Sequence, residues 1–159
     1  MAARNQKGSD DGTKTVASNR KARHNYIVLD QLEVGIALRG AEVKSLRNGN
    51  CSIEEAFARI ESNELWLHGM HITPYEAASL DSPLPRRPRK LLAHRAEIRR
   101  LMHRTRERGH TLVPLRVYFR SGKAKVALGV CKGKALHDKR EAIKRREEQR
   151  DLERLVRGR

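Results

Sequence analysis

The hydrophobic positions of the chain fall into short runs that are separated by polar stretches. Residues 26–29 and 35–38 are rich in strand-forming side chains, and a polar stretch joins them, which predicts two strands. Apolar residues alternate at 56–60, and the turn residues Ser62-Asn63 lead into another apolar run at 65–67. This pattern predicts a strand hairpin.

A further element is expected at 71–75, and a second hairpin follows later in the chain. Its strands are expected at 111–119 and 124–130, on either side of Ser121-Gly122-Lys123. The chain thus holds about six short strands and about two inserted helices, which favours a small closed barrel over a parallel sheet.

Two segments have the spacing of helices. The segment 41–49 has apolar residues at Val43 and Leu46 and ends in Asn-Gly, which is typical of a helix stop. Between 93 and 108, apolar side chains recur at spacings of three and four among many arginines, and a glycine follows. This predicts an amphipathic helix with a basic solvent-facing side.

Charge changes the picture, because the 159 residues carry 35 Lys and Arg against 19 Asp and Glu, a net charge of +16. A chain this basic attracts polyanions such as nucleic acids. The excess is local: residues 25–85 carry −5, residues 86–108 carry +8 and residues 132–159 carry +5. This uneven distribution of charge argues against a uniformly basic, histone-like protein.

Composition also divides the chain. Residues 1–18 are polar with scarcely an apolar side chain, and they are expected to be a disordered arm. Residues 19–131 are expected to form the barrel domain. Residues 132–159 are a basic tail with few apolar positions, expected to be disordered or helical until a partner orders it.

Candidate chemistry is sparse. The chain lacks a phosphate-loop, dinucleotide or nucleophile-elbow motif, and Cys51 and Cys131 lack a nearby cysteine. His68 and His71 point to opposite faces on an extended segment and lack a third ligand. We therefore expect no enzyme activity, catalytic residue, metal or cofactor. The chain lacks an apolar run long enough for a membrane span, and a cytoplasmic protein without membrane contacts is expected.

The basic residues around three prolines are more informative. Arg86, Arg87, Arg89 and Lys90 follow one another on a segment that proline stiffens, and arginine grips phosphate with two hydrogen bonds. These side chains are candidates for phosphate contacts, and the alternative is that they serve only solubility. Glu33 is a candidate acceptor for hydrogen bonds from base edges.

Several ordered blocks of the sequence resemble one known family. They are Asn19-Arg20-Lys21-Ala22-Arg23-His24 with Tyr26, Gly35 to Arg47, Ile72-Thr73-Pro74-Tyr75, Arg89-Lys90-Leu91-Leu92, Lys132-Gly133-Lys134 and His137-Asp138-Lys139-Arg140. From about residue 19 to about residue 146, these blocks closely resemble the SsrA-binding protein (SmpB) family. The resemblance implies a mainly β fold, an oligonucleotide-binding (OB) type closed barrel with about two to three flanking helices.

The resemblance also implies a function and a set of residues. It implies binding of the tRNA-like domain of transfer-messenger RNA (tmRNA, SsrA) and its delivery to stalled ribosomes in trans-translation, in association with elongation factor Tu through the aminoacylated RNA. The matching RNA-binding positions are His24, Glu33, Lys90, Leu92 and His94. The tail positions that match ribosome contacts, expected in the vacant messenger channel against small-subunit rRNA, are Lys132, Lys134, His137, Asp138, Lys139 and Arg140. The alternative function is that of a structural ribosomal protein that binds rRNA.

Overall fold

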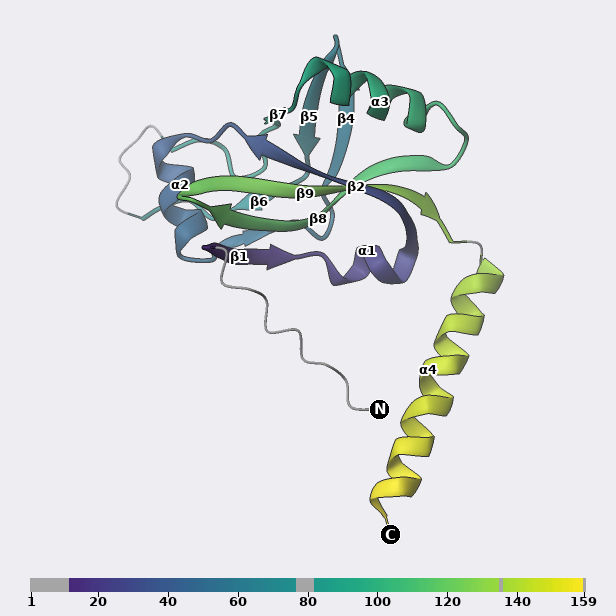
Figure 1. The fold of residues 1–159 in the computed structure, drawn as a ribbon. Coiled ribbons are helices and arrows are strands. Elements are labelled where there is room, and N and C mark those ends of the chain that lie inside the picture. Colours follow the sequence, from purple (N-terminus) through teal and green to yellow (C-terminus); the bar gives the residue numbers. More distant parts are fainter. Residues whose placement is uncertain (1–11, 77–81, 135, 159) are drawn as a thin grey trace.

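The structure is a computed structural model that describes residues 12–76, 82–134 and 136–158, with only the helical backbone described for 136–139. It consists of strands, the longest of 11 residues, and a few helices (Figure 1). In chain order they are β1 (Thr13–Ser18), α1 (Arg20–Asn25), β2 (Tyr26–Ile36), α2 (Gly40–Arg47), β3 (Cys51–Ser52), β4 (Phe57–Glu61), β5 (Glu64–His68), β6 (His71–Ile72), β7 (Arg89–Leu92), α3 (Arg95–Thr105), β8 (His110–Arg120), β9 (Lys123–Gly133) and α4 (Leu136–Arg157).

The main sheet closes on itself. Its strand order is β1-β8-β4-β5-β7-β2-β9, and β8 also pairs with β9, so the six strands from β8 to β9 form a closed ring and β1 adds to β8 outside it. All pairings are antiparallel. The prediction of a mainly β fold with a closed barrel and flanking helices is confirmed. β3 and β6 form a separate two-stranded sheet.

Strand β1 corrects the expectation of a disordered arm at 1–18. Residues 1–11 lie outside the described residues, but Thr13–Ser18 pairs with β8. The edge of β8 that faces away from β9 meets β4 at Leu112 and β1 from Arg116 onward. Val16 and Ala17 are partly buried against the core. An open strand edge therefore orders a segment whose own composition is polar, because it supplies the missing backbone partners.

Strand β2 also differs from the prediction, because the expected strands at 26–29 and 35–38 are one strand of 11 residues that ends at Ile36. The polar stretch between them pairs with β9 throughout, and a register shift between Val28 and Asp30 bends it. Backbone hydrogen bonds do not depend on side-chain polarity, so an outward-facing polar stretch continues a strand.

The two predicted hairpins are present, and their turns explain the local sequence. Ser62 and Asn63 have φ of 50° and 61°, and Ser121 and Gly122 have φ of 51° and 75°. Positive φ at both central residues is the geometry of the tight turns that match the twist of paired strands. Asparagine and glycine adopt this conformation most easily.

The helices flank the barrel, as the hydrophobic spacing predicted for α2 and α3. Leu46 of α2 and Leu101 of α3 are at most 1% exposed and belong to the same cluster as the barrel residues Leu65 and Leu128. The short helix α1 was not predicted. Its N-cap residue, Asn19, accepts a hydrogen bond from the backbone of Ala22 at 3.0 Å, which satisfies a free helix donor.

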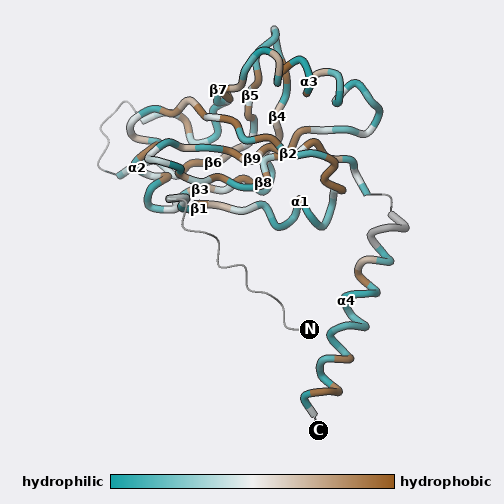
Figure 2. Tube along the Cα trace, in the orientation of Figure 1, coloured by the Kyte–Doolittle hydropathy of each residue, from teal (hydrophilic) through white to brown (hydrophobic). Residues whose placement is uncertain are grey.

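The last helix, α4, is unlike the others, because it extends away from the barrel (Figure 1). It is largely hydrophilic, with a few apolar positions toward its end (Figure 2). These apolar side chains, Leu152, Leu155 and Val156, are 62–76% exposed. The tail therefore takes the helical form of the two that were expected. None of the helices in the described ranges is long and apolar enough to cross a membrane.

Candidate nucleic-acid interface

Three of the predicted RNA-binding residues lie on one outward face of the barrel, which we call the β2–β7 face and define by Glu33, Lys90 and Leu92. Gly35 of β2 pairs directly with Leu92 of β7. Since alternate residues of a strand share a face, Glu33 lies beside Gly35, and Lys90 lies beside Leu92. A Cβ at Gly35 would stand 3.2 Å from the Cβ of Leu92, so glycine at this position leaves room for the Leu92 side chain to lie close to the β2 backbone.

Glu33 is held in place by residues of β8. The Tyr118 hydroxyl and the Nη1 of Arg120 donate hydrogen bonds to its Oε2, the second at 3.2 Å. The Tyr118 hydrogen bond, with help from Arg120 and against partial burial, holds the pKa of Glu33 below its usual value. Burial and the Glu33 carboxylate raise the pKa of Tyr118 to about 12. Glu33 is thus an ionised acceptor in a fixed position, with a side chain that is 38% exposed.

The β7 end of the face offers a cation and an apolar surface. Lys90 donates to Glu64 Oε1 at 3.0 Å, and both side chains are about 45% exposed. An exposed ion pair of this kind is worth little, so Lys90 is free to turn to a phosphate. Leu92 is 52% exposed. A large apolar side chain that is half exposed is suited to contact the sugar or base of a nucleotide.

His94 and His24 differ in their distance from the face. His94 follows Leu92 by two residues, at the start of α3, where its backbone N–H donates to Glu97 Oε2 at 3.0 Å. Its side chain is exposed beside the face. His24 instead lies in α1, before the other end of β2, and its Nδ1 is 3.5 Å from Arg146 Nη1 of α4. The structure therefore groups His94 with the face and separates His24 from it.

The sequence suggested that the cations at 86–90 lie together on one loop, but the structure separates them. Arg86 and Arg87 lie in the loop before β7, whereas Arg89 and Lys90 belong to the strand. Arg86 is exposed, and its guanidinium is 3.6 Å from a carboxylate oxygen of Glu55. The proposal that Arg86 contacts phosphate fits its exposure, because the pair with Glu55 is at the surface.

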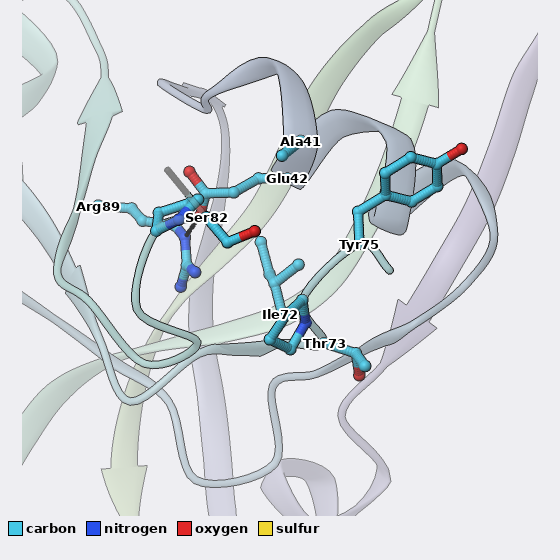
Figure 3. A pocket seen from close by; sticks show the side chains of 9 residues that line it. Ala41, Glu42, Ile72, Thr73, Tyr75, Ser82 and Arg89 are labelled. Carbon is cyan, nitrogen blue, oxygen red and sulfur yellow. Dashed lines mark hydrogen bonds and ion pairs between the residues drawn. The ribbon is translucent and has the colours of Figure 1, made fainter. Parts of the chain in front are cut away.

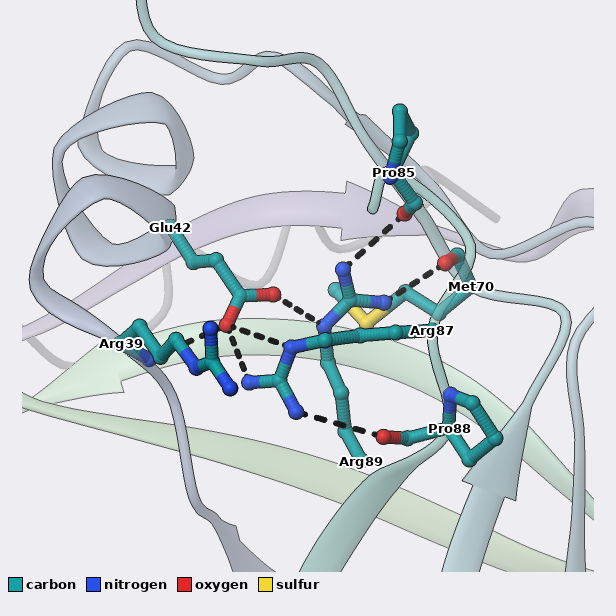
Figure 4. A network of polar contacts seen from close by, with 7 residues as sticks. All are labelled: Arg39, Glu42, Met70, Pro85, Arg87, Pro88 and Arg89. Carbon is teal, nitrogen blue, oxygen red and sulfur yellow. Dashed lines mark hydrogen bonds and ion pairs between the residues drawn. The ribbon is translucent and has the colours of Figure 1, made fainter. Parts of the chain in front are cut away.

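Arg89 is a correction. Its side chain is fully buried, and its guanidinium donates to Glu42, to the Met70 carbonyl at 2.7 Å and to the Pro85 carbonyl at 3.0 Å (Figure 4). The expectation that it contacts RNA phosphate is wrong, because its donors are used inside the protein. Arginine suits this position because its planar guanidinium group can donate hydrogen bonds to acceptors from three different segments at once.

Arg87 shares the same partner. Its guanidinium donates twice to Glu42 Oε1 and to the Pro88 carbonyl at 3.3 Å, and its side chain is 23% exposed. Glu42 also accepts from the backbone N–H of Arg39 at 3.0 Å (Figure 4). Burial acts to raise the pKa of Glu42, but the hydrogen bonds from Arg87, Arg39 and Arg89 outweigh it and hold the pKa below its usual value.

The Glu42 cluster, defined as Glu42, Arg87 and Arg89, therefore joins α2 to β7 and to the loop before it. Directly after Arg89 come Lys90 and Leu92 of the β2–β7 face. Buried ionic groups with all hydrogen bonds satisfied fix the positions of the segments that carry them. The cluster acts on the interface through the position of β7.

A small hollow lies next to this cluster, between Glu42, Arg89, Ile72 and Ser82 (Figure 3). Its volume is about 10 Å³, room for a single water and too small for an organic ligand. The ring of Tyr75 points away from it (Figure 3), with Lys44 Nζ 5.5 Å from the ring centre. Among the described residues, no group of three His, Cys, Asp or Glu side chains is placed to bind a metal ion.

The predicted tail residues occupy two kinds of position. Lys132 is exposed near the end of β9, and Lys134 donates from Nζ to the Arg23 carbonyl at 3.2 Å. Arg140 is exposed on α4. His137, Asp138 and Lys139 belong to the backbone of α4, and their side chains lie outside the described residues.

Sequence reasoning missed the β8 residues that support Glu33. Arg116, Tyr118 and Arg120 alternate along the predicted strand at 111–119 and its end, and the guanidinium of Arg116 lies 4.5 Å from the centre of the Tyr118 ring. The alternation was a usable signal for a polar outer face on this strand. Its distance from Glu33 along the chain hid the contact.

Comparisons with known proteins agree on one family. A family model described as SmpB protein matches residues 16–158. An SsrA-binding protein of Desulforudis audaxviator (strain MP104C) is 53% identical over 145 residues, covering 91% of this chain and 95% of that protein. An SsrA-binding protein of Thermobifida fusca (strain YX) is 48% identical over 159 residues, covering 100% of this chain and 99% of that protein.

A solved structure is also similar. It is described as "tmRNA-SmpB: a journey to the center of the bacterial ribosome", and it matches with a TM-score of 0.65 and 48% sequence identity. The match covers 80% of this chain and 93% of the other. With a family model over most of its length and relatives near 50% identity across nearly all of it, this chain belongs to the SmpB protein family, the SsrA-binding proteins.

Proposed function

We propose that this chain is an RNA-binding protein that binds the tRNA-like domain of tmRNA and delivers it to stalled ribosomes for trans-translation. The observation that carries the proposal is the near-complete match to SsrA-binding proteins at about 50% identity. The similar solved structure is of a tmRNA–SmpB complex in the bacterial ribosome. A net charge of +16 supplies the attraction to RNA.

In this proposal the β2–β7 face, with His94 beside it, contacts the tRNA-like domain. It combines a fixed acceptor (Glu33), a cation (Lys90) and an exposed apolar side chain (Leu92). Acceptors, cations and apolar contacts together recognise folded RNA, whose minor groove exposes 2′-hydroxyls and base edges. Exposed Arg86, in the loop before β7, is proposed to add a phosphate contact. The role of His24 is proposed from the resemblance alone.

The part of the tail that follows β9 is proposed to enter the vacant messenger channel of the small subunit, while Lys132 and Gly133 are paired with the barrel as the end of β9. Residues 132–159 carry +5, and α4 makes few contacts with the barrel, which suits a segment that binds rRNA through its backbone phosphates. Lys132, Lys134, His137, Asp138, Lys139 and Arg140 are its proposed ribosome contacts. Elongation factor Tu is proposed to join through the aminoacylated RNA, in the cytoplasm, and no catalytic step is assigned to the chain.

A truncated chain tests the proposal. The cut belongs after Lys134, because β9 runs to Gly133 and Cys131 is fully buried between β2 and β8. The shortened chain should bind tmRNA with nearly the full-length affinity, yet it should no longer support tagging of nascent chains on stalled ribosomes. Equal loss of both activities would overturn the division of roles between barrel and tail.

A structural ribosomal protein was the alternative function, and the family match disfavours it. Quantification across ribosome fractions separates the two. A structural component is present near one copy per ribosome in all fractions, whereas the proposed factor is substoichiometric and enriched on stalled ribosomes together with tmRNA.

A further inference from the structure

Tyr118 of β8 and Glu33 of β2 meet across the strand that lies between them, β9. Tyr118 pairs with Lys125 of β9, and Arg116, two residues earlier, pairs with Ala127. On the other edge of β9, Ala127 pairs with Glu33. Directly paired residues share a face of a sheet, so Glu33, Ala127 and Arg116 lie on the same face. The Tyr118 hydroxyl therefore reaches Glu33 diagonally across β9, past the small side chain of Ala127.

The tyrosine is buried although it is on the outer face of the barrel. Its neighbours Val117 and Phe119 belong to the core, so Tyr118 points the other way. Tyr118 is nevertheless only 3% exposed, and the guanidinium of Arg116 lies over its ring. A side chain so covered has too little free surface to contact RNA itself. Its hydroxyl instead has a partner inside the protein, the carboxylate of Glu33.

The two oxygens of the Glu33 carboxylate have different surroundings. Oε2 accepts hydrogen bonds from the Tyr118 hydroxyl and from Arg120 Nη1 at 3.2 Å. Oε1 has only that Arg120 nitrogen at 3.5 Å among the donors of the described residues. A carboxylate oxygen accepts more than one hydrogen bond, so Oε1 retains capacity for a 2′-hydroxyl or a base amine. Two donors on Oε2 fix the direction in which Oε1 points.

This arrangement matters because a glutamate side chain is flexible by itself. Holding a free glutamate in one geometry costs rotamer entropy at the moment when a ligand binds. The hydrogen bonds from Tyr118 and Arg120 restrict Glu33 before RNA arrives. They also hold the pKa of Glu33 below its usual value, so the side chain remains an acceptor in mild acid.

We infer that Tyr118 is a positioning residue for RNA recognition, whose hydroxyl directs the Glu33 carboxylate toward a donor group of the RNA with the assistance of Arg120. Tyr118 acts through Glu33 and does not touch the RNA. The inference deepens the proposed function and rests on it, because the RNA contact of Glu33 is part of that proposal.

A double-mutant cycle tests the inference. Tyr118→Phe removes only the hydroxyl, Glu33→Gln keeps the shape of the side chain without its charge, and a third variant combines both. Tyr118→Phe alone should weaken binding to a tRNA-like RNA about fivefold, as expected for a residue coupled to its neighbour. In the Glu33→Gln background, the same substitution should change affinity by less than about twofold. Tyr75→Phe is the matched control, because it removes a tyrosine hydroxyl beside Lys44 of α2, and it should bind normally.

The protonation of Glu33 provides a second readout, one that a purely structural role of Tyr118 does not move. Titration of isotope-labelled glutamate carboxyl groups by NMR follows the pKa of Glu33 in the free protein. This pKa should rise in Tyr118→Phe and stay low in Tyr75→Phe, because the Tyr118 hydrogen bond is the main cause of its lowering. An unchanged pKa in folded Tyr118→Phe would overturn the inference.

A variant at an exposed position guards against loss of the fold, which thermal melting detects. Arg120→Gln removes the second donor to Glu33, and Lys123→Gln removes an equal charge from the residue that pairs with Arg120. Arg120→Gln should weaken RNA binding more than Lys123→Gln does, and the excess should vanish in the Glu33→Gln background. Equal weakening by the two substitutions would contradict the support of Glu33 by its neighbours.

The remaining outcomes separate the inference from the proposed function. Equal weakening by Tyr118→Phe with and without Glu33→Gln would overturn the inference, since Tyr118 would then act independently of Glu33. If the natural chain binds tRNA-like RNA and folded Tyr118→Phe binds equally well, the positioning role is refuted and the proposed function stands. If the natural chain does not bind such RNA, both are refuted.

Discussion

Arg89 of β7 donates its Nε hydrogen to Glu42 of α2, although their side chains are 0% and 3% exposed and the residues are 47 positions apart. Two charges removed from water are stable only if each finds its full set of partners. Here the remaining donors of Arg89 reach two backbone carbonyls, and Glu42 accepts from Arg87 and Arg39 as well. The pair therefore links the first helix after β2 to the strand that carries Lys90 and Leu92.

Replacing Glu42 by alanine leaves Arg89 buried without its counter-ion. We expect Glu42→Ala to lower the free energy of unfolding by about 3–5 kcal/mol, measured by urea denaturation. Glu54→Ala is the matched control, because Glu54 pairs with Lys21 at 3.2 Å at the surface, and it should change stability by less than about 0.5 kcal/mol. Similar effects of the two substitutions would show that the buried pair is not special.

The same carboxylate makes stability depend on acid pH. Because the pKa of Glu42 is lowered in the folded chain, its stabilising effect is complete above the unfolded value of about 4.3 and is lost as the pH falls through the folded value. Asp30 and Glu33, whose pKa values are also lowered, act in the same direction. Between about pH 5 and pH 3, urea midpoints of the natural chain should fall more steeply than those of Glu42→Ala. Parallel curves would contradict this.

We expect Glu33 and Lys90 of the β2–β7 face to contribute to RNA affinity and not to the stability of the fold. Glu33→Ala combined with Lys90→Ala should weaken binding to a tRNA-like RNA about tenfold or more, since it removes a base or 2′-hydroxyl acceptor and a phosphate contact. Glu107→Ala with Lys123→Ala changes the same charges at exposed positions elsewhere and should bind normally. Gel-shift titration at moderate salt gives both affinities. Unchanged affinity of the first pair, with a normal melting curve, would exclude the face.

Gly69 is expected to be irreplaceable. Its φ is +78°, and a Cβ there would stand 2.8 Å from the carbonyl oxygen of Glu55. Gly69→Ala should therefore cost about 2 kcal/mol or more in unfolding free energy, from the left-handed backbone and the clash together. Gly40→Ala provides the comparison, because a Cβ at Gly40 meets open space at the start of α2, and it should be neutral or slightly stabilising. Equal costs would refute the steric explanation.

The cysteines are predicted to be unreactive. Cys131 is fully buried, and burial raises the pKa of its thiol to about 11. At pH 8 only roughly one thiol in a thousand is then ionised, against about one in four for an ordinary cysteine. Iodoacetamide should modify Cys131 at least about a hundredfold more slowly in the folded chain than in urea. Peptide mass analysis gives the two rates, and similar rates would mean that the β9 end opens readily.

Local sequence determined much of the fold. Hydrophobic spacing identified both hairpins, α2 and α3, because strand and helix periods are properties of a few neighbouring residues. The ordered motifs identified the family. The tail has few apolar residues, which predicted that it does not pack on the barrel, and the apolar side chains of α4 are indeed exposed.

Tertiary structure decided what local patterns do not contain. β1 is a strand only because the open edge of β8 is beside it, and the polar middle of β2 is a strand only because β9 pairs with it. Arg86 and Arg89 look alike in the sequence, yet one is exposed and the other is fully buried. The difference comes from Glu42 of α2, which is distant in the sequence and which the tertiary fold places beside Arg89. An arginine that is buried against a carboxylate of the protein has a structural role, whereas an exposed arginine stays hydrated and available to a ligand.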